Sequence, residues 1–310
     1  MDPALFQDDL EAKPHWLRTL ASRLPATVWP VQPGSSLLLT GMGSSWFAAD
    51  VAARRLRRAG VWAVADLASV EGSLPPAANL TVVGITASGG SGETLAQLET
   101  HHGVSNTVVL TNTDGLSLPA RHTMLMHAGP EAGGVACRSY LHTLVLLLHL
   151  EHQLTGGLPE LPAQVLRAAE AIEHLLDTRS TWLPSVLDVL DGSHGTWLLA
   201  PAERLGSALQ GALMLREGPR RAADGCETGD WNHVDVYLTK TLDYRALLFT
   251  GSRFDGAALQ WMRDRGSRVV AVGAGDDGAG DHGAPVEQRV RFPHDHDPVV
   301  ALLVEIVVAE

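Results

Sequence analysis

Short apolar runs alternate with helix-patterned segments twice along this chain, and this alternation constrains the fold more than any other feature. In the first half, apolar runs predict buried strands at residues 36–40, 61–65, 80–85, 107–111 and 123–126. Helix-like segments separate or follow them, at residues 46–58, 93–101 and 136–154. Apolar strands alternating with helices favour a parallel sheet that is covered on both faces.

The same pattern restarts after an amphipathic segment at residues 163–178. Strands are predicted at 196–200, 245–249 and 269–272, and helices at 205–216 and 298–308. Residues 273–285 are rich in Gly and Asp, which predicts a mobile loop. We therefore predict an α/β fold with two doubly wound αβα domains, each built on a mainly parallel sheet. The first domain would span residues 1–158 with an N-terminal helical segment, a helical connector 159–182, and the second domain 183–310.

Composition and charge narrow the class of protein. A chain of 310 residues with a formal net charge of −12 argues against nucleic acid or an anionic membrane as a partner. No apolar run is long enough to span a bilayer, and the first ten residues carry three acids and no base, unlike a secretory signal. The two cysteines, Cys137 and Cys226, lie far apart, which favours a reducing compartment. We expect a cytoplasmic protein.

The most informative motif runs from Thr86 to Thr94, directly after the predicted strand that ends at Ile85. Its hydroxyl groups, its glycines and the start of the following helix could together bind a phosphate monoester, with backbone N–H groups and the helix dipole as the positive end. The alternative is an ordinary Gly/Ser turn with a helix N-cap. The position at the carboxyl end of a parallel strand favours a ligand site.

Two other patterns could indicate a cofactor or a metal. Residues 40–46 resemble half of a dinucleotide-binding fingerprint, but Trp46 stands where the third glycine would be, and no acidic residue ends the next strand in the expected way. His294-Asp-His296-Asp has no further ligands in register, and Asp297-Pro298 is typical of a helix start. We predict neither a cofactor nor a metal site.

An ordered set of motifs covers nearly the whole chain. Its members are Gly41–Ser45, Thr86–Thr94, Thr111-Asn112, Ala128–Cys137, the helix-patterned Ala208–Glu217, and His233. Together they resemble the SIS (sugar isomerase) family, which includes the isomerase half of glucosamine-6-phosphate synthase. The resemblance implies two SIS domains and a hexose or hexosamine phosphate as ligand. It also implies aldose–ketose isomerisation, with or without loss of the amino group as ammonia.

The resemblance also implies roles for individual residues. Ser45, Thr86, Ser88 and Ser91 would bind the phosphate, and Ser44, Val135 and Cys137 would contact the sugar. Glu217 would move a proton between C1 and C2, and His233 would assist ring opening, as enediol chemistry requires. In the family this histidine reaches the site of a neighbouring subunit, so a homodimer with sites at its interface is expected. By themselves, Glu217 and His233 could equally be a solvated helix end and a surface loop residue.

Some positions depart from the family pattern. Met214 stands where the family has a basic residue, and Val234-Asp235 replaces the usual Gly-Pro after the histidine. The family's C-terminal tail with its lysine is not found after Glu310. Two alternatives to the isomerase therefore stay open: a deglycase acting on a fructosamine phosphate, and a non-catalytic sensor that binds a sugar phosphate.

Overall fold

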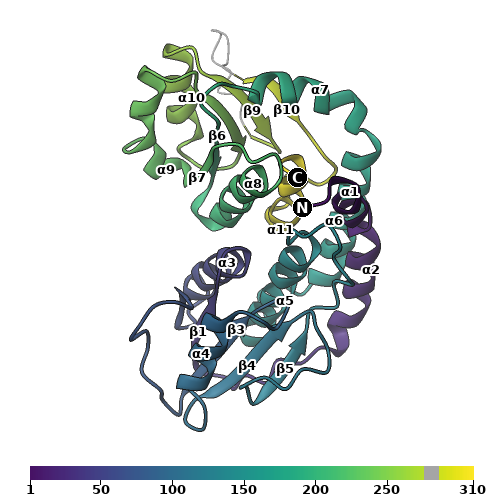
Figure 1. Cartoon of the computed structure of the whole chain (residues 1–310), viewed down its shortest axis with the longest axis vertical. Helices are drawn as coiled ribbons and strands as arrows, with labels where there is room; N and C mark the ends of the chain where they lie inside the picture. Colours follow the sequence, from purple (N-terminus) through teal and green to yellow (C-terminus); the bar gives the residue numbers. More distant parts are fainter. Residues whose placement is uncertain (276–285) are drawn as a thin grey trace. The chain divides into compact units, whose positions relative to one another are not determined.

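The computed structural model of the chain describes residues 1–275 and 286–310. Within them the fold is α/β, with two five-stranded sheets whose neighbouring strands are all parallel. The chain divides into two compact units, each of which contains one sheet (Figure 1). One unit is His15–Leu166, and the other combines Met1–Pro14 with Arg167–Glu310. The domain boundaries predicted above stay a prediction.

The unit His15–Leu166 is built on a sheet with strand order β2-β1-β3-β4-β5. The strands are β1 (Ser36–Gly41), β2 (Ala63–Leu67), β3 (Leu80–Ile85), β4 (Asn106–Thr111) and β5 (His122–Leu125). The helices are α2 (Lys13–Arg23, which starts just before the unit), η1 (Leu24–Ala26), α3 (Ser44–Arg58), α4 (Gly92–Thr100) and α5 (Arg138–Thr155), and α6 (Leu161–Asp177) begins at its end.

The other unit contains α1 (Pro3–Glu11) and a sheet of order β10-β9-β8-β6-β7. Its strands are β6 (Thr196–Ala200), β7 (Ala223–Glu227), β8 (Arg245–Phe249), β9 (Arg268–Val272) and β10 (Val286–Val290). Its further helices are α7 (Arg179–Leu190), η2 (Ala202–Arg204), α8 (Leu205–Glu217), α9 (Thr228–Trp231), η3 (Asp235–Lys240), α10 (Asp255–Asp264), α11 (Pro298–Val304) and η4 (Glu305–Val308).

The two sheets have the same topology. In each, the first strand lies between the second and the third, as β2-β1-β3 in one unit and β7-β6-β8 in the other. The direction of strand order therefore reverses between β1 and β3 and again between β6 and β8. Open α/β sheets bind ligands outside the carboxyl ends of their strands at this reversal, which is called the switch point.

Burial explains why the central elements form where the apolar runs predict them. Every residue of β3 and of β6 is buried, and α5 is buried along nearly its whole length. Gly156 ends α5 in the left-handed conformation (φ 70°), which glycine adopts without strain. The apolar run at residues 144–150 is thus part of a core helix. Among the described residues, no helix is both long and apolar enough to cross a membrane.

The strands and helices predicted from apolar runs are confirmed, with ends that differ by no more than two residues except that the last predicted helix finishes as a 3-10 turn. The prediction missed the edge strands β7 and β10 and the helices α7, α9 and α10. Both edge strands are only half-buried, so their sequences contain no continuous apolar run. Most of the predicted mobile loop, residues 276–285, lies outside the described part of the chain.

Candidate functional site

The loop between β3 and α4 begins with a tight turn. The Thr86 N–H donates to Leu110 O of the neighbouring strand β4 (3.0 Å), and the Gly89 N–H donates to Thr86 O (3.1 Å). Gly89 has a φ of 72°, where a side chain would be strained. The loop then enters α4 at Gly92. This geometry places the predicted phosphate-binding residues at the carboxyl end of β3.

Hydroxyl groups organise this loop from within. Ser91 is the N-cap of α4, since its Oγ accepts the Thr94 N–H at 3.4 Å, and this part of the capping interpretation is confirmed. Thr86 Oγ1 accepts the Ser91 N–H (3.3 Å), and Ser88 Oγ accepts the Gly90 N–H (3.2 Å). Thr86 is buried, Ser91 is half-buried and Ser88 is exposed.

Several backbone donors of the loop remain available. Within the described chain, no hydrogen-bond acceptor is found for the N–H groups of Ser88, Gly92 and Glu93. Gly92 and Glu93 belong to the first turn of α4, whose N–H groups have no partner inside the helix. Such donors at a helix N-terminus bind anions, because they add to the positive end of the helix dipole.

Residues at the end of β4 hold the β3–α4 loop in place by hydrogen bonds to one carbonyl group of that loop. Ala87 O accepts hydrogen bonds from the Asn112 N–H (2.9 Å) and from the hydroxyl groups of Thr111 (3.1 Å) and Thr113 (3.3 Å). The Asn112 side chain in turn donates to Gly129 O at 2.7 Å. The Thr111-Asn112 pair, which the sequence indicates only as a family match, therefore positions the loop.

The loop between β1 and α3 leaves the sheet beside the β3–α4 loop. Gly41 and Ile85, the last residues of β1 and β3, are partners in the parallel register, so both loops start at the same switch point. Ser44 begins α3, and the Ser45 N–H donates to Met42 O at 3.1 Å. The structure thus gathers Ser44 and Ser45 at the same sheet edge as the β3–α4 loop.

Gly41 is needed for this close approach of the two loops. A Cβ atom at this position would lie 2.6 Å from Ser45 Cβ and 3.0 Å from Ile85 O. Contacts of this length are repulsive, so any larger residue would push the β1–α3 loop away from β3.

Val135 and Cys137 lie just before α5 and offer little side-chain surface. Val135 is 6% exposed and Cys137 is fully buried. The N–H groups of Cys137, Arg138 and Ser139 all donate to Glu131 Oε1, at 2.8, 2.5 and 3.1 Å. The Glu131 carboxylate therefore occupies the N-terminus of α5. In this structure, Cys137 could contact a sugar only through its carbonyl group.

Glu217 and His233 are both exposed and lie in the same compact unit. Glu217 is the last residue of α8, and His233 follows α9, where its N–H donates to Asp230 O at 2.8 Å. The helix α8 connects the parallel strands β6 and β7, so it runs back from their carboxyl ends and ends near their amino ends.

His233 instead follows the carboxyl end of β7. A five-residue strand is about 16 Å long, so Glu217 and His233 lie beyond opposite ends of the strands in this sheet. The structure does not bring the two predicted catalytic residues of one chain together on this unit.

Two groups close to His233 in sequence are partly buried. Burial, followed by the negative charge of Asp235, raises the pKa of the Cys226 thiol, which keeps the thiol protonated at neutral pH. Burial likewise raises the pKa of Asp235. Because the thiolate is the nucleophilic form, we expect the Cys226 thiol to react slowly.

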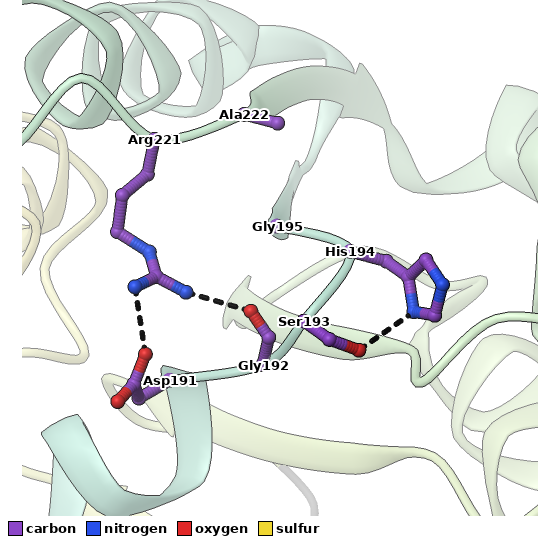
Figure 2. Close-up of a pocket in the computed structure, with 7 residues that line it drawn as sticks. All are labelled: Asp191, Gly192, Ser193, His194, Gly195, Arg221 and Ala222. Carbon is purple, nitrogen blue, oxygen red and sulfur yellow. Dashed lines mark hydrogen bonds and ion pairs between the residues drawn. The ribbon is translucent and has the colours of Figure 1, made fainter.

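An open pocket of about 540 Å³ lies at the amino ends of β6 and β7 (Figure 2). Figure 2 shows the Arg221 side chain reaching to Asp191 (2.7 Å) and to Gly192 O (2.6 Å). Ser193 Oγ contacts His194 Nδ1 at 3.0 Å. None of these residues was predicted to be functional. The polar groups of this pocket bond to one another and to Asp243, which accepts the Ser193 N–H and donates its own N–H to His194 Nδ1.

The predicted helix start at Asp297 is confirmed. Asp297 Oδ1 accepts the N–H groups of Val299 (2.9 Å) and Val300 (3.3 Å) and so caps α11. The preceding Asp295 forms an ion pair with Arg291. Over the described residues, no group of three or more potential ligand side chains is arranged to hold a metal ion.

Comparison with known proteins gives no matching family model. In sequence, the chain is 27% identical to the glutamine–fructose-6-phosphate aminotransferase [isomerizing] of Gloeobacter violaceus. The alignment is 250 positions long and covers 71% of this chain. The match covers 40% of that protein, so the chain corresponds to about two fifths of the relative's length.

Solved structures share the fold over nearly the whole chain. The C-terminal domain of glucosamine-fructose-6-phosphate aminotransferase from Francisella tularensis has a TM-score of 0.77 and 15% identity, covering 98% of this chain and 93% of that one. Glucosamine-6-phosphate deaminase from Thermotoga maritima has a TM-score of 0.73 and 14% identity, covering 98% and 91%. The resemblance predicted from the motifs is confirmed, and the structural likenesses establish the fold.

Proposed function

We propose that the chain binds the phosphate group of a hexose or hexosamine phosphate between its β1–α3 and β3–α4 loops and isomerises the sugar. The observation that carries this proposal is the convergence of two hydroxyl-rich loops at one switch point, next to unpaired N–H groups at the start of α4. Isomerisation would proceed with or without release of the amino group. The relatives named above act on, or are named for, sugar phosphates of this class.

The loops can bind a dianion although neither contains a basic residue between Gly41 and Ser45 or between Thr86 and Glu93. Ser45, Thr86, Ser88 and Ser91 contribute hydroxyl groups, and the loop adds its N–H donors. A hydrogen bond to a charged acceptor contributes about 1.5–3 kcal/mol, so a few of them suffice for micromolar binding. Ser44 and the main chain of Val135 and Cys137 would contact the sugar.

Glu217 would be the base of the isomerisation. Its carboxylate removes the proton from C2 of the open-chain aldose, which leaves an enediolate, and a proton moves from the C2 hydroxyl to O1. The carboxylic acid then returns its proton to C1, and O2 becomes the carbonyl oxygen of the ketose. Its exposure at the end of α8 leaves the carboxylate accessible to a ligand. His233 would donate a proton to the ring oxygen and so open the sugar ring.

A site that contains both groups needs two copies of the chain. Glu217 and His233 lie beyond opposite ends of the strands in one sheet, so His233 would come from the second copy in a homodimer. We also propose that each compact unit corresponds to one SIS domain, because the two sheets share one topology. The boundaries expected from the sequence are 1–158 and 183–310, with 159–182 as connector; the compact units differ from them in that Met1–Pro14 groups with Arg167–Glu310.

Deuterium exchange tests the proposed chemistry. The chain, incubated with fructose-6-phosphate or glucosamine-6-phosphate in heavy water, should incorporate deuterium at C1 or C2, measured by NMR. Glu217→Gln keeps the shape of the side chain but removes the base, so exchange should fall at least ~100-fold while binding is retained. Glu170→Gln, which changes an exposed glutamate on α6, is the matched control and should exchange like the wild type.

Two results would change the proposal. If the wild type binds a sugar phosphate but exchanges no deuterium, the chain is a sensor and not an isomerase. If exchange persists in Glu217→Gln, the chemistry is real but another group is the base. A fructosamine phosphate included as a third substrate, with release of the free amine as readout, separates the deglycase from the isomerase.

A further inference from the structure

The loop between β8 and α10, residues Thr250–Phe254, is the topological counterpart of the β3–α4 loop. Both follow the third strand of their unit at a switch point and lead directly into a helix. They also start alike, because the Thr250 N–H donates to Val272 O (3.1 Å) as the Thr86 N–H donates to Leu110 O (3.0 Å). The second unit therefore repeats the geometry from which we infer phosphate binding in the first.

A carboxylate of the chain itself occupies the β8–α10 loop. Asp255, the first residue of α10, accepts the N–H groups of Gly251 (2.6 Å) and Ser252 (3.1 Å) through the single atom Oδ2. In the β3–α4 loop, by contrast, Ser88 has no acceptor for its N–H in the described chain, and Glu93, near the start of α4, turns its carboxylate to the Ser91 hydroxyl (3.1 Å). Backbone N–H groups of the β8–α10 loop thus already bind a carboxylate of the chain, whereas the Ser88 N–H of the β3–α4 loop binds no acceptor in the described residues.

Arginine side chains lie near the Asp255 carboxylate and offset part of the cost of its burial. Arg204, from the turn after β6, donates to Thr250 O and, through Nε, to Glu305 Oε1 at 3.0 Å. Its guanidinium group also covers the loop, since a Cβ atom at Gly251 would lie 3.3 Å from Nη2. Burial raises the pKa of the Asp255 carboxyl, and the charges of Arg204 and Arg289 oppose this rise.

The second oxygen of this carboxylate, Oδ1, does not share the contacts of Oδ2. Asp255 is 7% exposed, and its Oδ1 is buried with no hydrogen-bond partner among the described residues. Leaving a buried carboxylate oxygen unpaired is costly, and nearby guanidinium charges offset part of that cost. The carboxylate therefore resembles a bound anion with two N–H contacts and an arginine beside it.

We propose that the β8–α10 loop is a second oxyanion site, filled by the chain's own Asp255 carboxylate. It takes an external oxyanion, such as formate or inorganic phosphate, only when that carboxylate is absent. Asp255 is then the residue that confines phosphate binding to the β3–α4 loop.

The test removes the carboxylate and supplies an anion. In a Ser88→Ala/Ser91→Ala background, which removes two hydroxyl groups of the first loop equally from all variants compared, Asp255→Ala leaves the N–H groups of Gly251 and Ser252 without an acceptor. Sodium formate and sodium phosphate are titrated against thermal unfolding, with sodium chloride at equal ionic strength as the reference. We expect Tm to rise by about 5–10 °C at an anion concentration of about 100 times Kd.

Asp255→Asn is the matched control, because its amide oxygen still accepts the two N–H groups and fills the same space. It should show no rise in Tm beyond that given by chloride. Absence of an anion-specific rise in Asp255→Ala, or an equal rise in Asp255→Asn, overturns the proposal. If Asp255→Ala does not fold, Asp255→Ser provides the same test, since a serine also removes the carboxylate while leaving a polar side chain at this position. Both readouts compare variants within one background, so they do not depend on whether the chain binds a sugar phosphate.

Discussion

Ser88 and Ser91 allow phosphate binding and fold stability to be separated in a single loop. Ser91 caps α4 and is half-buried, whereas the hydroxyl of the exposed Ser88 only accepts the Gly90 N–H. Ser91→Ala should therefore lower the free energy of unfolding by about 1 kcal/mol, as typical for an N-cap, and Ser88→Ala by less than about 0.5 kcal/mol. In a unit of this size, 1 kcal/mol lowers Tm by about 2–4 °C.

Binding should depend on both hydroxyl groups alike, whereas stability depends mainly on Ser91. Each hydroxyl that contacts the phosphate contributes about 1.5–3 kcal/mol, so either substitution should weaken Kd about 10- to 150-fold. The double variant should lose measurable binding while its circular dichroism spectrum stays that of the wild type. Calorimetric titration with glucosamine-6-phosphate measures Kd, and urea unfolding measures stability.

Thr100→Ala is the matched control for this pair. Its hydroxyl lies at the other end of α4, where it donates to Ala96 O at 2.9 Å. Removing it should change neither Kd nor Tm appreciably. If the Ser88→Ala/Ser91→Ala double variant binds the sugar phosphate with the affinity of the wild type, the β3–α4 loop is a capped turn and the phosphate site lies elsewhere.

Three further predictions follow from individual contacts. Gly41→Ala should destabilise the chain by about 1–3 kcal/mol in urea unfolding and weaken sugar-phosphate binding, because its Cβ would lie 2.6 Å from Ser45 Cβ; unchanged unfolding would contradict the close approach of the two loops. A mixture of inactive Glu217→Gln and His233→Ala chains should regain part of the deuterium exchange if His233 acts in the partner's site, and no recovery would place both groups in one chain's site. Cys226 should react with a thiol reagent at pH 8 more slowly than a free cysteine, because its raised pKa keeps the partly buried thiol protonated; a rate equal to that of free cysteine would contradict this.

Much of the fold could be predicted because buried parallel strands are continuous apolar runs. The strands β3 and β6 are buried at every residue, so their sequences alone indicate both type and position. The edge strand β7 reads Ala-Asp-Gly-Cys-Glu and is half-buried, so only its pairing with β6 identifies it as a strand. Local sequence fails where one face of a strand stays in contact with water.

The candidate site likewise has parts that local sequence predicts and parts that depend on the fold. The β3–α4 loop could be predicted as a candidate anion site, because a Gly/Ser motif after a buried strand depends only on neighbouring residues. The positions of Glu217 and His233 at opposite ends of the strands of one sheet could not, since they follow from the direction in which α8 crosses that sheet. The structure was also needed to place Arg204 against the second loop, because Arg204 and Thr250 are 46 residues apart in the chain. A local motif consists of contiguous residues and can be recognised in the sequence. The relation between two sites depends on strand order and helix direction, which determine where residues far apart in the chain lie.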